Sequence, residues 1–137
     1  MFYFSGANIG VSRVIVTLRP TEQVQLDRNR LMEIVARLGS RGADELISRV
    51  MEELAIQLSK VHNALGRGSI QDAQSAARKI VELAAHVGMP LLSDVAGHMV
   101  QLVNTDDGAA LAATAARLSR TGEASLMKVW ELKDLSM

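Results

Sequence analysis

The sequence predicts an all-α protein: an antiparallel up-down four-helix bundle with a short N-terminal capping helix and an N-terminal arm. With 137 residues, 48% of them hydrophobic, the chain suffices for one domain with a buried core. Its aromatic residues are only two Phe, one Tyr and one Trp, so the core must use Leu, Val, Ile, Ala and Met. Abundant Ala and Leu favour helices. From residue 21 onward the apolar residues recur with helical spacing.

Residues 1–20 are predicted to be an N-terminal arm, and residues 21–137 the bundle domain. Val14, Val16 and Thr17 are β-branched, so this part of the arm favours an extended conformation. A lone strand has no ladder partner within a helical domain. We therefore expect the arm to pack on the bundle or on a second copy of the chain, and the second arrangement would give a homodimer.

The first two predicted helices cover residues 22–38 and 43–65. The first is short and amphipathic, ends at Gly39 and is expected to cap one end of the bundle. In the second, apolar residues follow the i, i+3, i+4, i+7 spacing of a buried stripe. Gly66 and Gly68 then predict a tight reversal.

The third helix is predicted over residues 70–87. Ser69 and Asp72 resemble a capping box, in which the serine hydroxyl accepts from an unpaired backbone N–H. Gly88 is expected to close the helix. Pro90 fits the first position of the next helix, where its missing N–H would be unpaired in any case.

The last two helices are predicted over residues 90–103 and from residue 107 onward. Residues 104–106 mark the turn between them. Gly122 is expected to bend or interrupt the last helix. Because the connections are short, consecutive long helices must run antiparallel.

Helical spacing divides the third helix into two faces. Its inward seam is predicted to contain Ala73, Ala77, Ile80, Ala84 and Val87. The opposite face is predicted to contain Gln71, Ser75, Arg78, Glu82 and His86. Position 78 should therefore face solvent.

This arrangement resembles the histidine-containing phosphotransfer (HPt) domain, whose motif runs A-H-x-L-K-G, then five residues, then G, with a leucine four positions later. The resemblance covers about residues 25–118. The structural positions of the motif are occupied by Ala77, Ile80, Gly88 and Leu92. The family's apolar pattern continues on the next helix at Val95, Ala96 and Met99.

The chemical positions of the motif depart from the family. Arg78 stands where the family has its phosphorylated histidine, and a guanidinium that stays protonated is a very poor nucleophile. Val81 replaces the lysine that favours the phosphoryl group. Glu82 replaces a small glycine, and its carboxylate would repel a phosphoryl group by about 1 kcal/mol or more at about 4 Å. These residues form a degenerate phosphotransfer site.

The resemblance therefore implies a binding or scaffold module of two-component signalling that is not an enzyme, and the composition without cysteine favours a cytoplasmic location. Its expected partner is a response-regulator receiver domain or a histidine kinase. The expected docking face contains Gln71, Ser75, Arg78, Lys79, Glu82 and His86. Two alternatives stay open: an active phosphotransfer protein that uses His86 as a displaced phosphoacceptor, and a structural or oligomerisation bundle unrelated to signalling.

Composition argues against several other classes. Fifteen Lys and Arg balance fifteen Asp and Glu, which disfavours nucleic acid and anionic membranes as partners. No stretch is apolar enough to span a bilayer, and the absence of cysteine excludes disulfides and zinc-thiolate sites. The histidines at 62, 86 and 98 have no i, i+4 spacing, so we expect neither a metal nor a cofactor.

Overall fold

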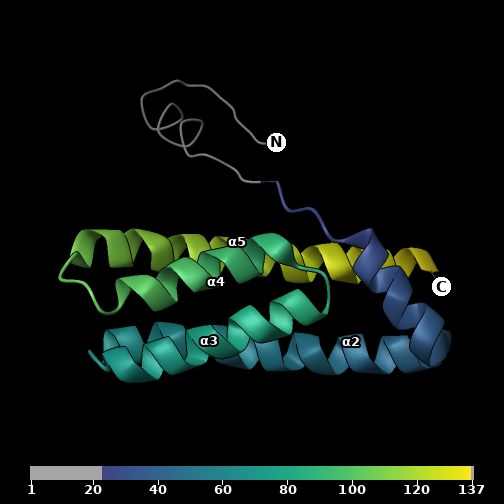
Figure 1. The fold of residues 1–137 in the computed structure, drawn as a ribbon, viewed down its shortest axis with the longest axis horizontal. Coiled ribbons are helices and arrows are strands. Elements are labelled where there is room, and N and C mark those ends of the chain that lie inside the picture. Colours follow the sequence, from purple (N-terminus) through teal and green to yellow (C-terminus); the bar gives the residue numbers. More distant parts are fainter. Residues whose placement is uncertain (1–22, 137) are drawn as a thin grey trace.

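A computed structural model describes residues 23–136, which form four α-helices and no strand (Figure 1). They are α2 (Arg28–Gly66), α3 (Ile70–His86), α4 (Pro90–Leu102) and α5 (Gly108–Ser136). The prediction of an all-α, four-helix protein is confirmed for this part of the chain. The predicted arm at 1–20 lies outside the described residues. None of the four helices combines the length and the apolar character needed to cross a membrane.

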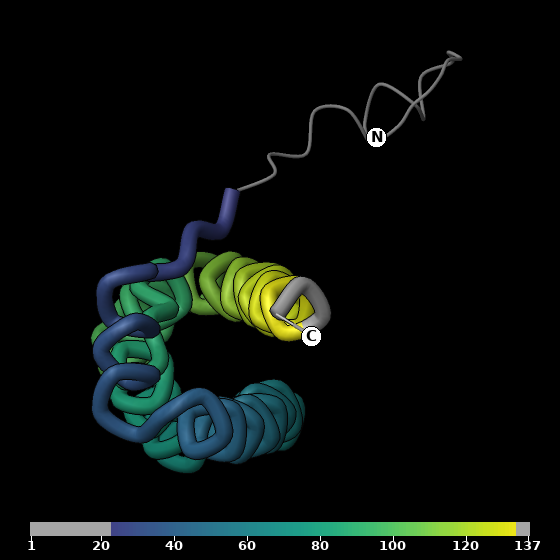
Figure 2. Tube along the Cα trace, turned by 90° about the vertical axis from the view of Figure 1, so that its right-hand side faces the viewer, coloured from purple at the N-terminus to yellow at the C-terminus, as the bar shows by residue number. Residues whose placement is uncertain are grey.

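The four helices pack alongside one another (Figure 1). α2 packs on α3, α3 on α4, and α4 on α5, and α5 also contacts α2. Seen end on, α2 and α5 border the same side of the molecule (Figure 2). The shared core is aliphatic, as predicted, and its largest fully buried side chains include Leu54, Ile80, Met89, Leu92, Met99 and Leu118.

Gly39 marks a kink at which two helical stretches meet within α2, as the predicted end of the first helix requires. Its φ of 76° and ψ of 169° are not helical, and they divide α2 where the first predicted helix was expected to end. The interval expected over residues 39–42 is therefore a single kinked residue. The expected start at residue 22 is also wrong, because α2 begins at Arg28, where the side chain of Asp27 accepts from Arg30 N at 3.1 Å.

Two hydrogen bonds join the start of α2 to the turn between α3 and α4. The backbone N–H of Asp27 donates to the carbonyl oxygen of Gly88 at 2.8 Å. The Arg30 guanidinium donates through Nε to the carbonyl oxygen of His86, also at 2.8 Å. Gly88 has a φ of 76°, and a Cβ there would lie 2.9 Å from the Asp27 oxygen. Only glycine fits this turn without strain.

The remaining connections follow the predicted residues with one exception. Pro90 begins α4, and Asp107 caps α5 by accepting from Ala110 N at 2.9 Å. The expected capping box at α3 is not formed, since the Ser69 side chain makes no bond to a helix N–H. Its hydroxyl instead donates to the Asp72 carboxylate at 2.8 Å, which satisfies the serine within its own turn.

α5 is not interrupted at Gly122, contrary to expectation. The glycine is buried, and a Cβ at this position would lie 2.7 Å from Leu58 Cδ1 of α2. Its role is therefore close packing between α2 and α5. A helical glycine at a close helix contact gives the same sequence signal as one that breaks a helix.

The Gly88 turn is tested by Gly88→Ala. The left-handed backbone and the contact with Asp27 should together lower the free energy of unfolding by about 2–4 kcal/mol. Gly97→Ala is the matched control, because Gly97 lies inside α4 with open space around it, and it should raise stability by about 0.5–1 kcal/mol. Urea denaturation followed by circular dichroism measures both. Equal stability of the two variants would contradict the role of this turn.

Candidate functional site: the exposed face of α3

The orientation of α3 is fixed by a buried seam of small side chains. All five residues predicted to face inward are buried, and so is Ala76. Alanine side chains end at Cβ, so they allow the backbones of neighbouring helices to approach closely. Ile80, with no exposed surface, is the large side chain of the seam and belongs to the main core cluster. This burial directs the opposite side of α3 to solvent.

The exposed side of α3 contains every residue of the expected docking face. At 100° per residue these positions fall within an arc of about 100°, so they form one stripe along the helix. We call it the α3 stripe, and its members are Gln71, Ser75, Arg78, Lys79, Glu82 and His86, all exposed. Arg78 lies midway along α3, with a helical turn or more of the stripe on each side.

Two side-chain hydrogen bonds hold α4 against α3 beside the stripe. Gln74 Nε2 donates to the carbonyl oxygen of Val100 at 3.2 Å, and Ser93 Oγ donates to that of Val81 at 2.9 Å. The Val81 side chain is half-buried and packs against the core. Position 81 therefore contributes to packing and does not present a charge to solvent.

The structure adds residues of α2 that sequence reasoning missed. A shallow groove runs between the two helices, beside the α3 stripe, and its lining comes from both helices. The lining residues are Gln57, Lys60, Asn63 and Arg67 near the end of α2, with Asp72, Ser75, Ala76 and Lys79 of α3. The spacing of the α2 residues and the tight reversal at Gly66 to Gly68 were the available signals. They could have indicated that this end of α2 lies across from the start of α3.

Cationic side chains predominate around this groove. Arg67 pairs with Asp72 at 3.5 Å, and because both are well exposed the pair contributes about 0–1 kcal/mol to stability. Lys60, Arg78 and Lys79 make no ion pair with any described residue. Their charges are thus available to an acidic partner surface.

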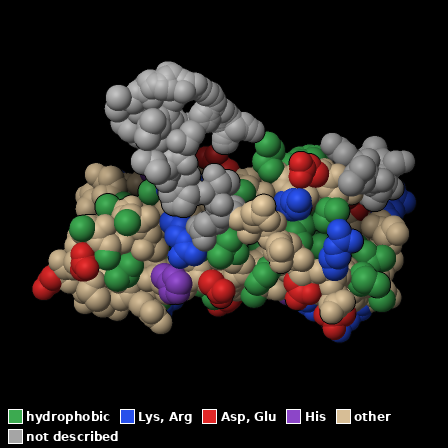
Figure 3. All heavy atoms as spheres, turned by 90° about the horizontal axis from the view of Figure 1, so that it is seen from above, with side chains coloured by type: hydrophobic (Ala, Val, Ile, Leu, Met, Phe, Trp, Pro, Cys, Tyr) green, Lys and Arg blue, Asp and Glu red, His purple; other side chains and the backbone are tan. Residues whose placement is uncertain are grey.

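On the face seen from above, the described residues carry side chains of both charges (Figure 3). In the view from above, acidic, basic and hydrophobic side chains are interspersed over the visible surface (Figure 3). Mixed charges of this kind produce no extended field of one sign. Within the described part of the chain, no three His, Asp or Glu side chains are grouped so that they could hold a metal ion.

His86 belongs to the α3 stripe, but its ring is engaged by α2. The Nη2 nitrogen of the Arg30 guanidinium lies 3.2 Å from Nδ1 of the His86 ring. Since arginine has no hydrogen-bond acceptor, Nδ1 must accept. The proton of the neutral ring is then on Nε2, and neither ring nitrogen has a free lone pair for attack on phosphorus. This geometry argues against His86 as a displaced phosphoacceptor.

The chain was compared with known proteins at three levels. No family model, no curated protein and no solved structure matches it.

The orientation of α3 is tested by a pair of alanine substitutions two residues apart, on opposite sides of the helix. Ile80→Ala removes a fully buried side chain and should lower the free energy of unfolding by about 3 kcal/mol. Arg78→Ala removes an exposed side chain and should change it by less than about 0.5 kcal/mol. Thermal and urea denaturation measure both. A larger loss for Arg78→Ala than for Ile80→Ala would show that α3 is turned the other way.

Proposed function

We propose that the chain is a phosphorylation-incompetent HPt-like module of a two-component phosphorelay, with an up-down bundle of HPt type. It acts in the cytoplasm and binds a response-regulator receiver domain or a histidine kinase. Its mechanism is competition for that partner or scaffolding. The observation that carries the proposal is the exposure of Arg78 midway along α3, at the position where the family has its phosphorylated histidine.

The bundle supports the structural part of the proposal. All four residues at the family's structural positions, Ala77, Ile80, Gly88 and Leu92, are buried. The apolar continuation on α4 is buried as well, at Val95, Ala96 and Met99. Burial at these positions is what the HPt frame requires, because the frame uses them to hold two adjacent helices together.

The chemistry of the α3 stripe supports binding without phosphotransfer. Arg78 and Lys79 can pair with carboxylates of a partner, and arginine can do so through two parallel hydrogen bonds. No nucleophile stands at position 78, and the nearest histidine on the stripe, His86, has its Nδ1 lone pair directed at Arg30. The partner is thus proposed to present an acidic surface to α3 and the end of α2.

Binding to purified receiver domains and histidine kinases of the source organism tests this function. Arg78→Glu reverses a charge at the centre of the stripe and should weaken binding by about tenfold. The matched control is Arg120→Glu, an equivalent reversal at an exposed position of α5, which should leave binding unchanged. Isothermal titration calorimetry gives both affinities. If no receiver or kinase binds, the structural or oligomerisation bundle becomes the better explanation.

A further inference from the structure

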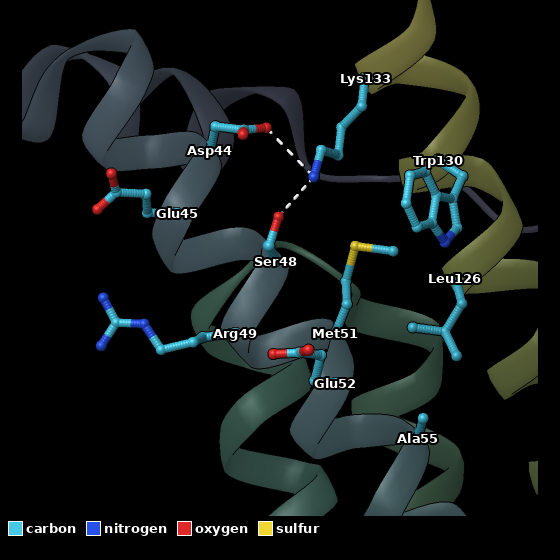
Figure 4. A pocket seen from close by; sticks show the side chains of 10 residues that line it. All are labelled: Asp44, Glu45, Ser48, Arg49, Met51, Glu52, Ala55, Leu126, Trp130 and Lys133. Atoms are coloured by element: carbon cyan, nitrogen blue, oxygen red, sulfur yellow. Dashed lines mark hydrogen bonds and ion pairs between the residues drawn. The ribbon is translucent and has the colours of Figure 1, made fainter.

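A second surface feature, away from the α3 stripe, is an apolar groove between α2 and α5. The side chains of Met51 and Ala55 on α2 face those of Leu126 and Trp130 on α5 across it (Figure 4). The Trp130 side chain is 56% exposed, and Met127 beside it is 66% exposed. The groove is lined by residues of α2 and α5, the two helices that border one side of the molecule in the end-on view (Figure 2).

Lys133 closes one end of this groove. Its ammonium lies 3.2 Å from Asp44 Oδ1 and donates to Ser48 Oγ, so it joins α5 to α2 (Figure 4). The same ammonium lies 5.1 Å from the centre of the Trp130 ring, within the range of a cation–π interaction. These contacts hold the indole at the mouth of the groove, where it presents apolar surface to an occupant.

The described chain begins close to this part of α5. Residues 23–29 line a hollow together with Lys128 and Leu132, which are one turn or less from Trp130. Residues 1–22 therefore join the fold beside the same end of α5. Twenty-two residues span up to about 70 Å when extended, and a helix with its side chains is about 10–12 Å thick. The segment is long enough to pass around α5 into the groove.

The sequence of this segment matches the groove in polarity and charge. Residues 1–18 include Phe2, Tyr3 and Phe4, a β-branched run at 14–17, and one charged side chain, Arg13. Burial of apolar surface contributes about 25 cal/mol per Å², so aromatic side chains gain most from such a site. The groove lining has a small excess of negative charge, because Asp44 is paired with Lys133, and Glu45 and Glu52 stand against Arg49.

We propose that residues 1–18 occupy the groove between α2 and α5 of their own chain and cover Trp130. The segment then adds apolar contacts between the first and last helices of the bundle. This contact is separate from the α3 stripe, and it leaves the proposed docking face open to a partner.

A spin label tests the contact in the full-length chain. The sequence has no cysteine, so Ser5→Cys accepts a nitroxide at one position, and Ser12→Cys provides a second position if the first label disturbs the contact. The only tryptophan gives a single indole N–H signal in the spectrum of ¹⁵N-labelled protein. With at least one of the labels, the Trp130 indole signal should lose most of its intensity and regain it when the nitroxide is reduced.

Two controls decide where the segment binds and in which chain. Ala55→Glu places a carboxylate in the groove and should restore the Trp130 signal, whereas Ala113→Glu, at an exposed position early in α5, should not. Spin-labelled ¹⁴N chain mixed with unlabelled ¹⁵N chain should leave the signal unchanged. Broadening in this mixture would overturn the proposal in favour of a second copy in the groove. Full intensity with both labels would overturn it altogether.

Discussion

The close packing of α3 through small side chains is the constraint on which the rest of the structure depends. Ala73, Ala76, Ala77 and Ala84 have no exposed surface or very little, and Ile80 lies among them. Because alanine adds no bulk beyond Cβ, α3 can lie close to both α2 and α4, and the rotation of α3 about its axis is fixed. That rotation determines which residues reach solvent. The exposure of Arg78 follows from the seam on the other side of the same helix.

Helical periodicity and glycine positions were enough to predict most of the elements. These two signals gave wrong predictions at glycines, because glycine can either end a helix or allow close packing inside one. Gly39 ends a helical stretch, as expected, but the backbone returns to helical φ and ψ angles at the next residue. Gly122 allows close packing of α5 on α2, and α5 continues through it. The start of α2 combines a local cap by the Asp27 side chain with a long-range hydrogen bond from Asp27 N–H to Gly88, and local propensity cannot indicate the second contact.

The α3 stripe was predicted because a helix places residues on its faces by geometry alone. Features that join separate helices were not predicted from the sequence. The contribution of Lys60 and Arg67 depends on how α2 and α3 are aligned across their hairpin, and the contact between Arg30 and His86 joins residues far apart in sequence. The groove beside Trp130 likewise depends on the separation of α2 and α5. The tight reversal at Gly66 to Gly68 could have indicated the first of these features, whereas the other two require tertiary packing to be known.

The central proposal is an HPt-like frame without phosphotransfer chemistry, and a phosphoryl-transfer assay tests both parts. The wild type should take no acid-labile ³²P from a phosphorylated cognate receiver or from a kinase with ATP. The triple variant Arg78→His, Val81→Lys, Glu82→Gly introduces the HPt motif, with positions 78 and 82 exposed and position 81 half-buried, and it should become labelled. Label on the wild type that is lost in His86→Ala would contradict the absence of chemistry. A folded triple variant without label would contradict the frame.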